Sequence, residues 1–156
     1  MIARNNDTVI VNLIEGVELT PLRRIHTPNG DVLHAMKSTD HGYTGFGEVY
    51  FSEVLGGAVK GWKRHNRITL NIVVVAGAIR FTVYDDRQGS VTQGKYFRTI
   101  LSPDTDDSYC RLTVAPGLWM AFEGVAPTTS LLMDLIPEPH DPTEADRREL
   151  SDIVYP

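Results

Sequence analysis

The feature that most constrains the fold of this chain is a series of short β-prone segments that runs from about residue 45 to residue 136. These segments are rich in Val, Ile, Thr, Tyr and Phe, and clusters of Gly, Pro, Asp and Ser separate them. Such spacing predicts an all-β sandwich or barrel. The strands that we expect lie at 8–13, 17–26, 31–37, 45–54, 58–65, 67–75, 78–85, 95–101, 110–115, 117–123 and 129–136.

Length and composition favour one domain that spans residues 1–156. The 156 residues, 42% of them apolar, can fill one core, and no Pro-rich or Ser-rich linker divides them. Only DPTEADRREL at 141–150 has a helical pattern, because Pro and Thr stand near its start, acids in its first turn and arginines later. We therefore expect a short C-terminal helix that closes the surface of the fold.

The charge of the chain limits its partners. A net charge of −5 supplies no basic field for a nucleic acid, although two or three local cations could hold the diphosphate of a nucleotide-sugar.

Cys110, the only cysteine, excludes an internal disulfide framework and a thiolate metal cluster, and fits a reducing cytoplasm. The start MIARNNDTVIVNLIEG lacks a signal-peptide pattern, and no apolar run approaches the roughly 18 residues of a membrane span. We expect a cytoplasmic protein without membrane contact.

Alternation along the expected strands separates two faces. In 67–75 the apolar residues of one face recur every second position, as Ile68, Leu70, Ile72 and Val74. Asn71 therefore lies on the other face. Glu48, Tyr50 and Ser52 likewise share one face of a strand. Such polar faces suit either a barrel whose lumen holds a ligand or strands that meet solvent.

Four segments between residues 57 and 122 resemble the dTDP-4-dehydrorhamnose 3,5-epimerase family in order and spacing. They are GAVKGW at 57–62, VVVAGAIRFTVYDDR at 73–87, SVTQGKY at 90–96 and LTVAPGLWMAF at 112–122. The resemblance implies an RmlC-like cupin, that is, a jelly-roll β-barrel, which acts on a nucleotide-linked deoxysugar and forms homodimers. This family works without a cofactor by removing a proton next to a ketone.

The chain departs from this family at positions that carry chemistry. Lys63 stands where the family has its base, a histidine, and Met120 replaces the second histidine of the motif. The acid tyrosine of the family should fall near Leu132 or Met133, and its nucleotide-clamping segment reads TPNGDVLH at 27–34.

A related family, the dTDP-4-keto-6-deoxyglucose 3,4-ketoisomerases, is similar at a different point. KGWKRH at 60–65, followed by Gly77, reproduces the spacing of its R-G-x-H-A-H motif. His65 then matches the second histidine of the acid/base pair in that family, and Lys63 replaces the first.

Lys63 and His65 also form a candidate site on their own chemistry. In an extended strand they point to the same side, which Gly61 leaves open for a ligand. A histidine can exchange protons with a carbon acid, and a neighbouring lysine can stabilise an enolate or act as a base. The alternative is a solvated edge strand, because K-R-H-N-R also suits an exposed turn.

Further candidates surround this pair. Tyr50 and Glu48 occupy positions where the resemblance implies sugar and phosphate contacts, and Tyr50 could supply the missing acid, although a strand tyrosine commonly packs in a core. Asn71, on its polar face, is a further candidate substrate contact, and Lys60 is the candidate phosphate contact.

Three more positions are weaker candidates for substrate binding. Trp119 could stack on a base or a sugar, or belong to the core or a dimer interface. Arg24 and His34 lie near the segment that in the family helps to hold the nucleotide.

The histidine pattern predicts no metal site. Metal-binding cupins use H-x-H, a nearby glutamate and a distant histidine, whereas those places hold Lys63, His65, Thr69 or Leu70, and Met120. The other histidines that we considered are scattered, which suggests surface or structural roles; they are His26, His41 and His140.

Our first hypothesis is a cofactor-independent epimerase or keto-isomerase of a nucleotide-linked 4-keto-6-deoxysugar, with His65, Lys63 and Tyr50 as its catalytic residues. The alternative is a non-catalytic cupin that binds a sugar or a nucleotide-sugar. A redox or dioxygenase cupin would need a bound metal.

Overall fold

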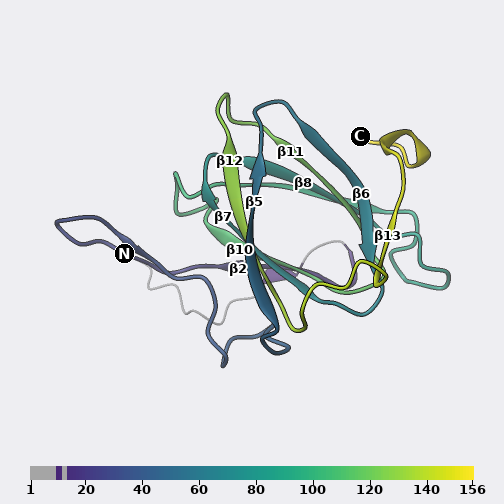
Figure 1. Ribbon diagram of the computed structural model, residues 1–156, viewed down its shortest axis with the longest axis horizontal. Helices are drawn as coiled ribbons and strands as arrows, with labels where there is room; N and C mark the ends of the chain where they lie inside the picture. Colours follow the sequence, from purple (N-terminus) through teal and green to yellow (C-terminus); the bar gives the residue numbers. More distant parts are fainter. Residues whose placement is uncertain (1–9, 12–13) are drawn as a thin grey trace.

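Two antiparallel sheets face each other in the computed structural model of the protein, which describes residues 10–11 and 14–156 (Figure 1). The six-stranded sheet has the order β1-β2-β10-β7-β12-β5, and the five-stranded sheet has the order β13-β6-β11-β8-β9. This arrangement confirms the predicted all-β jelly-roll class. The strands are β1 (Ile10–Val11), β2 (Val17–Pro21), β3 (Arg24–Ile25), β4 (Val32–Leu33), β5 (Glu48–Val54), β6 (Val59–His65), β7 (Leu70–Ala76), β8 (Ile79–Tyr84), β9 (Tyr96–Leu101), β10 (Cys110–Val114), β11 (Trp119–Gly124), β12 (Ser130–Ile136) and β13 (Ala145–Arg147).

The main core lies between the two sheets and comes from alternate residues of their strands. Its members include Ile72 and Leu112 of the six-stranded sheet, and Phe81 and Val83 of the five-stranded sheet. The four apolar positions expected on one face of 67–75 all belong to this core. The polar face of that segment therefore points away from the interior of the sandwich.

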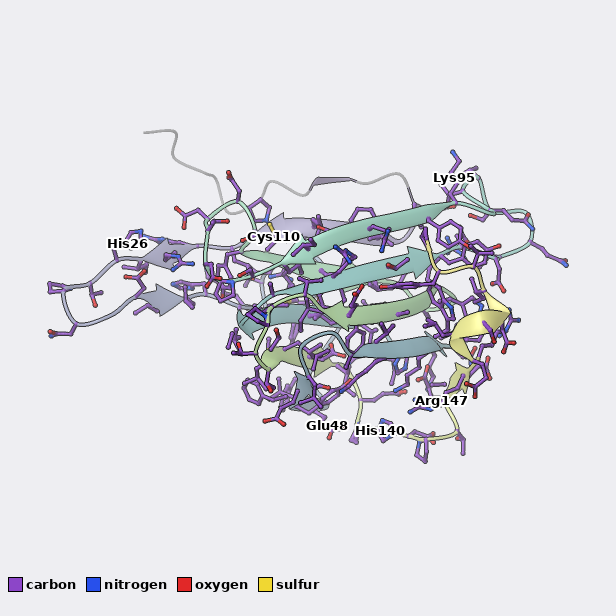
Figure 2. All side chains as sticks on the ribbon, turned by 90° about the horizontal axis from the view of Figure 1, so that it is seen from above. His26, Glu48, Lys95, Cys110, His140 and Arg147 are labelled. Atoms are coloured by element: carbon purple, nitrogen blue, oxygen red, sulfur yellow. The ribbon has the colours of Figure 1, made fainter. Side chains whose placement is uncertain are left out.

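A short hairpin, β3 with β4, extends from the two sheets (Figures 1 and 2). Arg24 and His26 both contact the carboxylate of Asp31, at 3.4 and 3.0 Å, which ties the two arms together. The strand expected at 31–37 is present only at Val32–Leu33. The first expected strand, 8–13, lies partly outside the described residues, and its described part, Ile10–Val11, pairs with β2.

The helix predicted at 141–150 was wrong. Residues 145–147 form β13, which adds an edge strand to β6, and only Leu150–Asp152 forms a single 3-10 turn, η1. The local pattern of charges favoured a helix, but sheet pairing and the burial of Glu144 outweigh it, because a buried carboxylate needs the hydrogen bonds that this position provides. In the described part of the chain, no helix is long and apolar enough to cross a membrane.

Candidate active site

A cavity of about 230 Å³ opens between the two sheets. One wall comes from β5, β7 and β12, and the other from β6, β11 and β13. Both polar and apolar residues line it: Tyr50, Ser52, Lys60, Gly61, Lys63, His65, Leu70, Ile72, Met120, Phe122, Leu132, Asp134 and Arg147. Lys63 and His65 both line it, as alternation along β6 requires.

His65 is paired with a buried carboxylate. Its Nδ1 lies 2.6 Å from Oε2 of Glu144, whose side chain has no exposed surface. The other carboxylate oxygen, Oε1, accepts backbone N–H bonds from Asn66, Arg67 and Ile68 at 2.7, 2.7 and 3.1 Å. An ionised Glu144 therefore accepts a hydrogen bond from Nδ1–H of His65, which leaves Nε2 unprotonated and able to accept a proton.

The protonation of this pair suits a base. Burial lowers the pKa of His65, and the charge of Lys63 lowers it further, whereas the bond to Glu144 opposes the shift. Burial by itself would raise the pKa of Glu144, but the bonds from Arg67 N–H, His65 and Ile68 N–H outweigh it and lower that pKa. Near neutral pH the pair thus consists of a neutral imidazole and a carboxylate.

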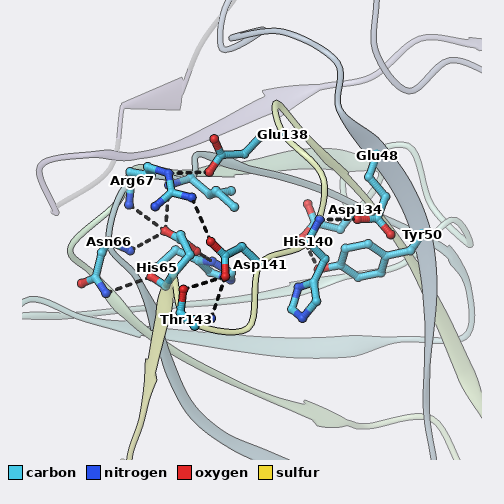
Figure 3. Close-up of polar contacts among 12 residues, drawn as sticks. Glu48, Tyr50, His65, Asn66, Arg67, Asp134, Glu138, His140, Asp141 and Thr143 are labelled. Carbon is cyan, nitrogen blue, oxygen red and sulfur yellow. Dashed lines mark hydrogen bonds and ion pairs between the residues drawn. The ribbon is translucent and has the colours of Figure 1, made fainter.

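The segment that carries Glu144 is held at the edge of the cavity by ion pairs (Figure 3). The Arg67 guanidinium contacts Glu138 at 2.6 Å and Asp141 at 3.4 Å. Asp141 also accepts hydrogen bonds from the backbone and the hydroxyl of Thr143. These contacts, together with the pairing of β13 with β6, keep the Glu144 carboxylate next to His65 Nδ1.

A second hydrogen-bonded pair lies on the opposite wall, at the right of Figure 3. Tyr50 Oη lies 2.9 Å from Oδ2 of Asp134, and Asn71 N–H donates to Oδ1 of Asp134 at 3.1 Å. Burial raises the pKa of Asp134 to about 7, although these hydrogen bonds and the charge of Lys63 oppose the shift. Burial and the Asp134 charge raise the pKa of Tyr50 well above its usual range.

Three cations line the same cavity in a chain of negative net charge. Lys60 Nζ donates to Ser52 Oγ at 2.7 Å and lies 5.7 Å from the centre of the Phe122 ring. Lys63 and Arg147 are register partners on β6 and β13. Burial and the charge of Arg147 lower the pKa of Lys63, while Asp134 and Glu144 oppose this shift. Such a group of cations suits an anionic ligand.

Glu48 and Asn71, both expected to contact substrate, do not line the cavity. The Glu48 carboxylate accepts the backbone N–H of His140 at 2.7 Å, and Figure 2 shows both residues at the same edge of the molecule as Arg147. Asn71 faces away from the cavity, where its side chain donates to Gly42 O and accepts from the Thr113 hydroxyl. Alternation predicted two faces of β7 but did not say which one meets the other sheet.

Trp119 also lies elsewhere, on the outer side of the five-stranded sheet. It is 1% exposed, its Nε1 donates to Asp86 at 2.9 Å, and the guanidinium groups of Arg64 and Arg148 lie 4.6 and 4.5 Å from its ring centre. Trp119 therefore belongs to a buried cluster and does not stack on a ligand in this cavity, because Met120 and Phe122 of the same strand take the cavity side.

Arg24 and His34 belong to the β3–β4 hairpin region and are absent from the cavity lining. Arg24 pairs with Asp31 and Asp106 and lies 5.7 Å from the centre of the Tyr109 ring. The carbonyl of His34 accepts the Tyr109 hydroxyl at 2.8 Å.

The sequence interpretation missed Asp134, Glu144 and Arg147. Asp134 left a signal, because it is the only charge in the otherwise apolar strand SLLMDLI. Glu144 and Arg147 left none, because they lie in the segment that resembled a helix. Within residues 10–11 and 14–156, no group of three His, Cys, Asp or Glu side chains could hold a metal ion.

The two-sheet cupin sandwich thus brings a histidine–glutamate pair and a tyrosine–aspartate pair to one cavity, an arrangement suited to acid/base chemistry. The chain matches no protein-family model and none of the curated proteins. It is 35% identical to the dTDP sugar isomerase of Desulfovibrio desulfuricans G20, with a TM-score of 0.86 over 90% of this chain and 88% of that one.

More distant solved structures share the fold. NovW, a 4-keto-6-deoxy sugar epimerase from Streptomyces spheroides, is 21% identical, with a TM-score of 0.79 over 90% of this chain and 72% of that one. The dTDP-6-deoxy-D-glucose-3,5-epimerase of Legionella pneumophila is 17% identical, with a TM-score of 0.78 over 90% and 76%. The chain belongs to the RmlC-like family of sugar-nucleotide epimerases and isomerases.

Proposed function

We propose that the protein is a cofactor-independent epimerase or keto-isomerase of a nucleotide-linked 4-keto-6-deoxysugar. The observation that carries this proposal is the cavity in which the His65–Glu144 pair faces the Tyr50–Asp134 pair, with Lys63 also in its lining. The membership of the RmlC-like family and the dTDP sugar isomerase at 35% identity support it.

His65 acts as the base in this proposal. Glu144 fixes its tautomer and stabilises the imidazolium that forms when Nε2 removes a proton from the carbon next to the ketone. The electron pair of the broken C–H bond moves to the ketone oxygen as an enolate. Lys63, a cation in the same lining, stabilises that oxygen.

Tyr50 acts as the acid. It comes from β5, on the wall opposite β6, so base and acid approach a bound sugar from different sides. Its proton goes to the enolate carbon, and the carbonyl forms again. The imidazolium and the tyrosinate then return to their starting states by proton exchange with water.

Lys60 and Arg147 are the proposed contacts of the diphosphate. Both line the cavity, and the family works on sugars that carry this group. A lysine and an arginine in one cavity lining can neutralise two phosphate charges, the arginine with a bidentate hydrogen-bond pattern.

Exchange with deuterated water tests the proposal. With dTDP-4-keto-6-deoxyglucose as first substrate, NMR should show deuterium entering a ring carbon. His65→Gln should slow this exchange by about 10² to 10⁴, since it removes the general base. Asp104→Asn, at an exposed position in the loop between β9 and β10, serves as control and should leave the rate unchanged.

A panel of dTDP-, GDP-, UDP- and CDP-linked 4-ketosugars distinguishes the proposed enzyme from a non-catalytic binding cupin. If none of them exchanges a ring proton, the proposal is wrong. A thermal shift with nucleotide-sugar and no exchange would instead identify a non-catalytic binding cupin.

The proposal includes a homodimer. The edge strand β5 and its flanks carry exposed apolar side chains, Phe46, Val49, Phe51 and Leu55, each at least 42% exposed. Exposed apolar side chains grouped along one sheet edge suit a protein interface. Light scattering should give the mass of a dimer for the native chain and of a monomer for Phe51→Glu; a native monomer would contradict the proposal.

A further inference from the structure

Asp134 is an unusual residue for its surroundings. It is 2% exposed, it is the only charged residue of its strand, and it lines the cavity. In the described part of the chain, no ion pair joins its carboxylate to a cation. Burying a carboxylate without an ion pair costs free energy, so a residue of this kind at a cavity wall marks a functional position.

A backbone hydrogen bond determines which oxygen of Asp134 contacts Tyr50. Asn71 N–H donates to Oδ1 of Asp134, which leaves Oδ2 for the Tyr50 hydroxyl. One bond therefore joins Oδ2 and Oη at 2.9 Å, and its direction depends on which oxygen carries a proton.

The two directions have opposite consequences for Tyr50. When Asp134 is ionised, Tyr50 must donate its only proton to it, and this proton is turned away from the cavity. When Asp134 is neutral, its own O–H donates to Oη, and the Tyr50 proton is free to point at a ligand. A neutral Asp134 also stabilises a tyrosinate, whereas a carboxylate beside it would repel the new charge.

We propose that Asp134 is a positioning residue that makes the Tyr50 proton available to the substrate only while Asp134 itself is protonated. The inference rests on the proposed function, because it assigns a role within the same acid/base site. It goes further by giving the site an upper pH limit that comes from a residue other than the acid and the base.

The protons of the proposed reaction balance without any net proton transfer to or from Asp134. His65 gains the proton of the substrate C–H bond, Tyr50 Oη loses its proton to the enolate carbon, and Asp134 keeps its proton and donates the hydrogen bond to the tyrosinate. Water then removes the proton from His65 and returns one to Tyr50. No oxidant or reductant enters.

The groups that face Asp134 come from several elements. Lys63 on β6 favours its ionised form, and Tyr50 and Asn71 N–H favour it through hydrogen bonds. Glu48, at the start of β5, acts on Tyr50. The cavity residues of β7 and β11 carry no charge, and burial prevails over the favourable contacts, so the pKa of Asp134 is raised to about 7.

Asp134→Asn tests this inference through the pH profile of kcat/KM. The amide keeps both bonds, since its oxygen can accept from Asn71 N–H and its NH₂ can donate to Tyr50 Oη at every pH. In the native protein we expect kcat/KM for formation of the epimerised or isomerised product to fall about tenfold per pH unit above about 7, as one neutral carboxyl is lost. Asp134→Asn should lose this alkaline limb and keep the acid limb, which belongs to His65.

Controls separate this role from a structural one. Tyr50→Phe should abolish formation of the product at every pH, and the exposed loop variant Asp104→Asn should keep the native profile. An alkaline limb with the same midpoint in the native protein and in Asp134→Asn would overturn the inference and leave the proposed function intact. No exchange at any pH in the native protein would overturn both.

A second measurement needs no turnover. Carbon NMR of the Asp134 carboxyl, assigned by backbone-to-side-chain correlation in isotope-labelled native protein, should titrate with a midpoint near 7 in the free protein. A midpoint in the ordinary aspartate range, near 4, would overturn the inference even if the variant failed to fold.

Discussion

Asp134→Asn should change how the free energy of unfolding depends on pH. The pKa of Asp134 is about 7 in the folded protein and 3.8 in an unperturbed aspartate. Between these values the folded state holds a proton that the unfolded state has lost, so the native free energy of unfolding falls as pH rises. The stability that Asp134 gives is complete below the unfolded pKa and is lost as pH passes about 7.

The magnitude follows from the two pKa values. Each unit of difference corresponds to about 1.4 kcal/mol, so the full effect is about 4 kcal/mol. From pH 5 to pH 8 the native protein should lose about 2 to 3 kcal/mol relative to Asp134→Asn, because the amide does not titrate and keeps the bonds to Tyr50 and Asn71.

Urea unfolding at half-unit steps from pH 5 to pH 8 measures this difference. Asp104→Asn removes an exposed carboxylate from the loop between β9 and β10 and should follow the native curve, and the other titrating groups cancel because both proteins contain them. A constant difference between the native protein and Asp134→Asn over this range would refute the reasoning, since it would mean that Asp134 has an ordinary pKa.

Other changes probe the rest of the site and the fold. Glu144→Gln keeps an oxygen for the backbone N–H groups but places an NH₂ against His65 Nδ1, which forces the proton onto Nε2; deuterium exchange should slow by about 10² to 10⁴. An unchanged rate would remove Glu144 from the mechanism. Lys63→Met should lower kcat by about 10² to 10³ if its ammonium stabilises the enolate, and a change in KM alone would assign it to binding. Gly77→Ala should destabilise the protein by more than about 1 kcal/mol in urea, because φ is 73° there and the new Cβ would overlap Ser130 Oγ; equal stability would contradict this account of the turn.

Much of the fold could be predicted from local patterns. The strands β5 to β12 lie within a few residues of their predicted bounds, because alternation and turn residues act over short distances. The same alternation placed Lys63 and His65 on one side of β6, where both line the cavity.

The C-terminal segment shows where local patterns fail. Its charges favour a helix, but pairing with β6 supplies backbone hydrogen bonds and lets Glu144 receive His65 and three N–H groups. These partners lie between 76 and 79 residues away along the chain. No local window contains them.

The sequence by itself determined the strand periods, the turns and the candidate base, because these depend on neighbouring residues. Only the tertiary structure decided that Asn71 faces outward, that Glu144 is hydrogen-bonded to His65, and that Asp134 is hydrogen-bonded to Tyr50. The physical reason is that burial and hydrogen bonding of charged groups depend on which strands meet across the sandwich. Those encounters turn separate side chains into two hydrogen-bonded pairs at one cavity.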